Sequence, residues 1–250
     1  MKKYILGAAA LLALAAPSIA SAQSGYVGLS YSQNDDTEID SLSLNGSVAL
    51  GSNFQLDGGY AQLETNADDA DTYNIGGHLF TRGANWLWGG YLGYNSTDAG
   101  GDSLDEWIAA GQVQYYADRT TFSGDLSYSQ SEFLVDIDQW ALDGEARYFV
   151  TDNFSLQGNL GYFEASADGG GDLDGTNYGV GAEWQLTGAP ISIYGGWQQV
   201  DIDGNDSSSL GIGARWNFGG TLFERNRSGA GLSRPTGFLE RVLVAQVTPR

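Results

Sequence analysis

The sequence predicts an all-β protein, an antiparallel transmembrane β-barrel of about 12 strands joined up and down. Three observations support this prediction. Large apolar residues alternate with polar ones along many segments, short and long connections alternate between these segments, and aromatic residues stand near both ends of the apolar faces. Residues 51–60 show the plan and residues 151–162 repeat it, each a polar turn followed by an alternating segment. Because successive side chains of a strand point to opposite faces, each copy has one apolar and one polar face.

The first 22 residues are typical of a secretory signal peptide. Lys2 and Lys3 precede an apolar run, and a small-residue cleavage site ends at Ala22. We therefore expect export of the chain. Both lysines lie in this segment, so the exported chain keeps nine arginines against 31 acidic residues, a net charge of −22. This charge excludes binding to nucleic-acid phosphates, and the absence of cysteine excludes disulfides and thiol catalysis.

Twelve alternating segments follow the signal peptide. They cover residues 26–31, 42–50, 54–63, 73–79, 86–94, 107–115, 122–128, 140–148, 154–162, 178–184, 191–197 and 210–218. We expect strands of about 9–11 residues, the length that a tilted membrane strand needs. Short turns are expected at 51–52, 82–83, 117–119, 151–153 and 187–189. The alternate connections are longer and acidic, which predicts short periplasmic turns and longer, negatively charged extracellular loops.

Aromatic residues favour a membrane barrel over a soluble β-sandwich. Pairs such as Trp86 with Tyr94 and Trp140 with Tyr148 share the apolar face of one segment, and all seven tryptophans lie on such faces. The separation of each pair, roughly 15–20 Å along the membrane normal, suits the two interfaces of a bilayer. The opposite faces carry Ser, Asn, Gln and Gly, whereas a solvent-facing sheet would carry more Lys and Glu.

Further features give the chain a family resemblance. Gly-x-Gly steps occur at 179–181 and 211–213, and the last alternating segment ends with Trp216 and Phe218. With the signal peptide and the aromatic belts, residues 23–219 resemble Gram-negative outer-membrane β-barrel proteins of the porin-like group. The resemblance implies an outer-membrane location, contact with outer-membrane lipid and lipopolysaccharide, and recognition of Trp216 and Phe218 by the barrel insertion machinery. In that family the aromatic end of the last strand usually closes the chain, whereas here residues 219–250 follow.

The polar faces would line the barrel lumen, and their charged residues are the candidate pore lining. These residues are Asp57, His78, Asp125, Asp143, Glu145, Arg147, Glu183 and Arg215. Five acids against two arginines would favour cations in a water-filled pore. We therefore expect a passive, weakly cation-selective diffusion channel for small hydrophilic solutes or ions, with no enzymatic activity, cofactor or metal. A homo-oligomer is compatible with this expectation.

Two alternatives remain for the lumen residues and the loops. Glu145, Arg147, Glu183 and Arg215 could pair across strands and only hold the barrel shape. The segments 168–175 and 201–206 have calcium-like oxygen spacing but lack a complete calcium loop. They leave open a non-conducting structural or adhesive barrel whose acidic loops bind divalent ions, although solvated loops are the simpler interpretation.

A third hypothesis is that the protein is a hydrolase, and this hypothesis depends on its single histidine. His78 could serve as a general base, but no nucleophile pattern stands out in the sequence. A histidine with satisfied hydrogen bonds in the lumen is therefore the favoured interpretation.

The C-terminal segment, residues 220–250, differs from the barrel in charge. It has five of the nine arginines and only two acids, Glu224 and Glu240. After Pro235 the apolar residues have helical spacing, and they are Phe238, Leu239, Val242 and Leu243. The segment starts on the periplasmic side, so we expect a basic periplasmic tail that plugs the acidic lumen, docks on a periplasmic partner or stays disordered.

Overall fold

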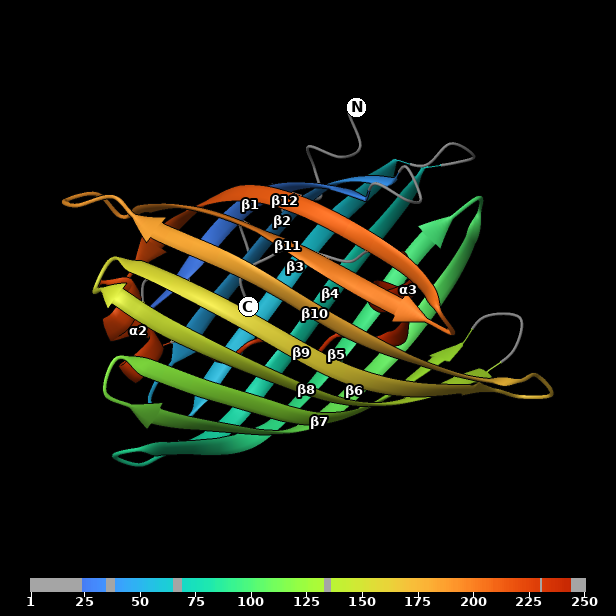
Figure 1. Ribbon diagram of the computed structural model, residues 1–250, viewed down its shortest axis with the longest axis horizontal. Coiled ribbons are helices and arrows are strands. Elements are labelled where there is room, and N and C mark those ends of the chain that lie inside the picture. The colour runs from blue at the N-terminus through green and yellow to red at the C-terminus, as the bar shows by residue number, and fades with distance from the viewer. Residues whose placement is uncertain (1–23, 35–38, 65–68, 133–135, 230, 244–250) are drawn as a thin grey trace.

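Twelve strands form one closed, antiparallel, up-and-down barrel (Figure 1), which confirms the predicted fold class. The computed structural model describes residues 24–34, 39–64, 69–132, 136–229 and 231–243. The predicted signal peptide and the connections 35–38, 65–68 and 133–135 lie outside the described residues. Each strand pairs with its neighbours in the sequence, and β12 pairs with β1 to close the barrel.

The strands and helices have the following bounds. The strands are β1 (Ser24–Asn34), β2 (Ile39–Leu50), β3 (Phe54–Glu64), β4 (Ala70–Arg82), β5 (Trp86–Ala99), β6 (Asp102–Ala117), β7 (Thr120–Glu132), β8 (Asp136–Thr151), β9 (Phe154–Ala167), β10 (Asp172–Gln185), β11 (Ile191–Ile202) and β12 (Asn205–Phe218). Two short helices follow the barrel, α2 (Leu222–Ser228) and α3 (Phe238–Leu243). Within the described residues no helix has the length and apolar character to cross a membrane.

The strands are longer than the sequence suggested. They contain between 11 residues, as in β1, and 16 residues, as in β6 and β8. The ladder of β11 and β12 continues to the pair Ile202 and Asn205, so most of the expected loop at 201–206 is strand that ends in a tight turn. Asp203 and Gly204 form this turn with φ values of 51° and 80°. Alternation of apolar residues ends at the aromatic belts, but backbone pairing continues where both faces are polar.

The two ends of the barrel differ in their connections, and we call them the turn end and the loop end. The turn end carries the connections 51–53, 83–85, 118–119, 152–153 and 186–190, and also the start of β1 and the end of β12. The loop end carries the other connections. Helix α2 lies at the turn end, and α3 lies inside the barrel toward the loop end (Figure 1).

The outer surface of the barrel is apolar and has aromatic residues near both ends. Trp86 packs against Tyr115 at the turn end with ring centroids 4.5 Å apart, and Tyr94 packs against Trp107 toward the loop end at 4.9 Å. Six of the seven tryptophans are exposed, and Trp197 is half-buried. An apolar outer band between two aromatic girdles is typical of a barrel that faces lipid.

Replacing Leu160, in the middle of β9, by arginine tests this assignment. Leu160 is 70% exposed on the outer face. If lipid surrounds it, Leu160→Arg should lower the free energy of unfolding by about 2–4 kcal/mol, because an arginine at the bilayer midplane is poorly solvated. The measurement is a denaturant titration of the protein folded into phospholipid vesicles. Ser166→Arg, on the same outer face of β9 but beyond Tyr162, is the control and should cost at most about 1 kcal/mol. Equal losses at both positions would contradict a lipid-facing band.

Candidate functional site

The structure places the eight candidate pore-lining residues on the inner wall of the barrel, where alternate positions of each strand face inward. His78, Asp143, Glu183 and Arg215 are buried there, and the other four are partly buried. Most of these residues are in direct contact with one another or with the C-terminal tail, so the contacts set the shape of the lumen.

Glu145, Arg147, Glu183 and Arg215 form two ion pairs on the inner wall. Arg215 Nη1 lies 2.9 Å from Glu183 Oε2, and Arg147 Nη2 lies 3.0 Å from Glu145 Oε1. The Arg215 guanidinium also lies over the ring of Tyr26, at 4.3 Å from its centroid. This is the arrangement expected if these four residues hold the barrel shape. The pairs are also compatible with a role in lining a pore.

His78 is fully buried and has a partner at each ring nitrogen. Its Nδ1 lies 2.6 Å from Gln112 Oε1, its Nε2 contacts the Asp57 carboxylate, and its ring packs against Tyr91 with centroids 4.7 Å apart. The two hydrogen-bond partners are an amide and a carboxylate, neither of which is a nucleophile of the serine or cysteine type. The geometry therefore matches a satisfied lumen histidine.

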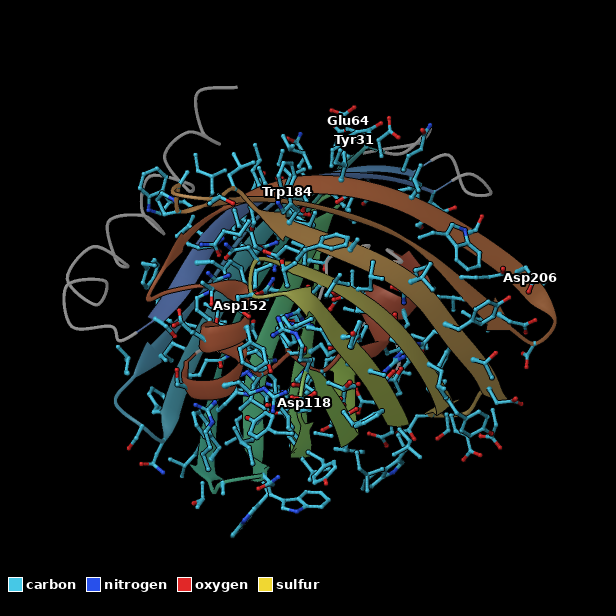
Figure 2. The ribbon with its side chains drawn as sticks, turned by 60° about the vertical axis from the view of Figure 1, so that its left-hand side comes forward. Tyr31, Glu64, Asp118, Asp152, Trp184 and Asp206 are labelled. Atoms are coloured by element: carbon cyan, nitrogen blue, oxygen red, sulfur yellow. The ribbon has the colours of Figure 1, made fainter. Side chains whose placement is uncertain are left out.

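The tail begins with α2, which caps the turn end of the barrel. Thr221 and Glu224 form a capping box at the start of the helix. The backbone N–H of Phe223 donates to Asp152 O (3.0 Å), and Arg227 Nη2 donates to Asp118 O (2.6 Å). Both acceptors belong to tight turns of the wall, and Figure 2 labels Asp118 and Asp152 at this end. The helix is thereby fastened to the rim.

After α2 the tail enters the lumen as a segment without helix or strand, residues 231–237. Wall glutamines satisfy its backbone. Gln55 accepts from the N–H of Leu232 (3.2 Å) and donates to its carbonyl (2.8 Å), while Gln112 donates to Ser233 O and Gln114 to Gly231 O. Because buried backbone groups need partners, these side chains take the place of a neighbouring strand.

An apolar cluster holds the same segment from the side. Leu232 packs among three inward-facing residues of the wall, Phe80, Leu87 and Tyr116. Inward-facing apolar residues of this kind have no place in a lumen that holds only water. Phe80, Leu87 and Tyr116 are the signal in the sequence for a docked tail. They are not among the predicted lumen residues, because that prediction considered only the charged residues of the inward faces.

Helix α3 is held by two buried carboxylates of the wall. Glu106, which is fully buried, accepts the N–H of Phe238 at 2.6 Å and also bonds to Asn95 and Ser131. Arg241 pairs with Asp143 and donates to Asn177 Oδ1 (2.5 Å). Of the two carboxylates, Asp143 was a predicted lumen residue and Glu106 was not. Of the three outcomes considered for the tail, the described residues adopt the first and occupy the lumen.

Gly237 is the position where the tail and the wall approach most closely beside α3. A side chain there would overlap with the Glu106 carboxylate. We therefore expect Gly237→Ala to displace α3 from Glu106 and make the tail more accessible to protease, while the barrel stays folded. Gly171→Ala, at a position with open space around it, is the matched control. Unchanged proteolysis of Gly237→Ala would contradict this docking.

A polar cavity of about 130 Å³ remains beside the tail. Its walls come from the inner faces of β1 to β4 and β8 to β12 and from the tail itself. The charged residues that line it are Asp57, Arg147, Glu183, Arg215, Arg225, Arg234, Glu240 and Arg241. Five arginines face three acids. The wall contributes two residues of each sign, so the excess of positive charge in this cavity comes from the tail.

Comparison with known proteins identifies the fold. No protein-family model matches the chain, and no curated protein sequence matches it. Among solved structures, the NanC porin is similar with a TM-score of 0.63 at 10% identity, covering 77% of this chain and 100% of that one. The KdgM porin in complex with disordered oligogalacturonate gives a TM-score of 0.55 at 9% identity, covering 77% and 99%. OmpT, an outer membrane protein of Vibrio cholerae, gives 0.50 at 11%, covering 78% and 96%. These likenesses confirm the porin-like barrel fold.

Proposed function

We propose that the protein is an outer-membrane channel for passive diffusion of small hydrophilic solutes, with a lumen narrowed by its own C-terminal tail. The observation that carries the proposal is a closed barrel with an apolar, aromatic-belted exterior and a polar interior that still holds a cavity beside the tail. The similarity in fold to solved porins supports it. The mechanism needs no binding step, only a hydrated path along the lumen.

The ion selectivity of this channel depends on the wall and the tail together. We propose that the wall favours cations. Its predicted lumen residues include five acids and two arginines, namely Asp57, Asp125, Asp143, Glu145, Glu183, Arg147 and Arg215, and the inward-facing Glu106 adds a sixth acid. The tail brings Arg225, Arg234 and Arg241 into the same space. We therefore expect a weak cation preference that the docked tail reduces.

The proposed location follows from the same barrel. The chain would span the outer membrane in contact with lipid and lipopolysaccharide, with the turn end on the periplasmic side. Strand β12 ends at Phe218, and Trp216 is exposed on the outer face. Both residues are thus at the end of the last strand, where the insertion machinery would read them.

Recordings of the purified full chain in planar bilayers test the channel. Discrete conductance steps are expected. In a salt gradient across the bilayer, the reversal potential should be small and should have the sign expected for a pore that prefers cations. Failure of both the full chain and the tail-less barrel to conduct would reject the channel.

A second candidate, a non-conducting structural barrel, is favoured by one observation, the tail that fills the lumen. Among the described residues no group of three or more acidic or histidine side chains is placed to hold a metal ion. The recordings above decide between the two functions.

A further inference from the structure

Arg225 differs from the other arginines that line the lumen cavity. Each of the other four has an acidic partner, in the pairs Arg147–Glu145, Arg215–Glu183, Arg234–Glu240 and Arg241–Asp143. Arg225 is buried in α2, and no described carboxylate lies within ion-pair distance of it. Its two hydrogen bonds both use Nη1 and go to neutral acceptors, Gln185 Oε1 at 2.9 Å and Gly220 O at 3.2 Å.

The surroundings of Arg225 do not compensate its charge. The charged side chains that act on it are Glu183, Arg215 and Arg147. Arg215 and Glu183 neutralise each other, and Glu145 neutralises Arg147, so the positive charge of Arg225 remains. Burial lowers the pKa of Arg225 to about 10, which expresses the cost of holding this charge away from water. A buried charge without a counter-charge is unfavourable, and a bound ion of opposite sign relieves it.

The cavity beside Arg225 has the space and the donors for such an ion. Arg147 and Arg225 both line it, and its volume of about 130 Å³ exceeds that of one water many times over. The Arg147 Nε is buried and has no acceptor among the described residues. The Arg225 Nε and Nη2 likewise make no hydrogen bond to a described residue, since both bonds of this side chain use Nη1. Guanidinium groups bind oxyanions through two parallel N–H donors.

We propose that the part of this cavity nearest the turn end binds a small oxyanion such as inorganic phosphate or sulfate on Arg225 and Arg147. Arg225 belongs to the tail and Arg147 to β8 of the wall, so the bound anion joins the two. It acts as a counter-ion that fastens α2 inside the barrel mouth. Binding of the anion does not require the barrel to conduct.

The test follows the thermal unfolding of the full chain in detergent, by its heat-dependent migration on gels. Sodium phosphate replaces sodium chloride at constant ionic strength. Phosphate bound to the folded state should raise the midpoint temperature with the logarithm of its concentration. Phosphate also stabilises proteins in general by exclusion from their surface, so the informative quantity is the difference between wild type and Arg225→Gln. The variant should lose the concentration-dependent part of the rise.

Arg119→Gln is the matched control, because Arg119 pairs with the exposed Asp152 at the same end of the barrel. This variant should keep the full rise. Equal rises in wild type and Arg225→Gln would overturn the proposal. Calorimetric titration of phosphate into wild type and into Arg147→Gln gives a second readout that does not depend on the folding of the Arg225 variant. Saturable binding that weakens in Arg147→Gln supports the site, and absence of binding to wild type overturns it.

Discussion

Removal of residues 221–250 is expected to raise the single-channel conductance severalfold. The tail contacts the wall from Asp152 at the turn end to Glu106 and Asp143 in the half toward the loop end, so it obstructs most of the length of the lumen. A lumen of about twelve strands lies between the filled eight-stranded barrels and the open sixteen-stranded ones, so a peptide inside it leaves little room for solutes. The measurement compares conductance steps of the full chain and the truncated chain in planar bilayers.

The same truncation should strengthen the preference for cations. It removes the arginines of the tail and leaves the acids of the wall without them, Asp143 among others. The reversal potential in a salt gradient should therefore shift further toward the value expected for an ideally cation-selective pore. Heat-dependent migration on gels is the control for folding of the truncated barrel. Unchanged conductance of a folded truncated barrel would show that the tail does not obstruct the path.

Arg241→Ala is expected to release the inner part of the tail. The Arg241 and Asp143 side chains are 2% and 3% exposed. Removing one partner of a buried pair leaves an uncompensated charge and costs about 3–5 kcal/mol. Docking of α3 should weaken by this amount, and chymotrypsin cleavage after the buried Phe238 should become faster by at least about a hundredfold, since each 1.4 kcal/mol is a factor of ten. Cleavage reports opening of the tail when reclosing is fast.

Two further variants define this effect. Arg119→Ala breaks an exposed pair with Asp152 and removes a contact over the ring of Phe223 in α2, away from α3. It is expected to cost about 0–1 kcal/mol and to leave α3 protected. Asp143→Asn combined with Arg241→Ala removes both charges, so it should recover part of the protection that Arg241→Ala alone loses. Equal cleavage rates in wild type and Arg241→Ala would mean that the pair does not hold the tail.

Local patterns of the amino-acid sequence are sufficient to define the wall of the barrel. Alternation along segments such as 54–63 predicts which side chains face outward, and the pair Trp86 and Tyr94 places the two aromatic belts. Both were confirmed, because the two-residue period of a strand is a local property that each segment carries in full. Strand ends were less predictable, since the ladder of β11 and β12 continues through residues that are polar on both faces.

The position of the tail inside the lumen depends on contacts between residues far apart in the sequence. The apolar spacing around Phe238 predicted a short helix, but three destinations for the tail were equally compatible with the residues 220–250. Its docking depends on contacts such as Gln55 with Leu232, 177 positions apart, and Phe238 with Glu106, 132 positions apart. No local period encodes such contacts, because a buried glutamine or glutamate of the wall looks the same in sequence whether it faces water or a peptide. The tail therefore changes the charge of the lumen in a way that only the folded chain shows.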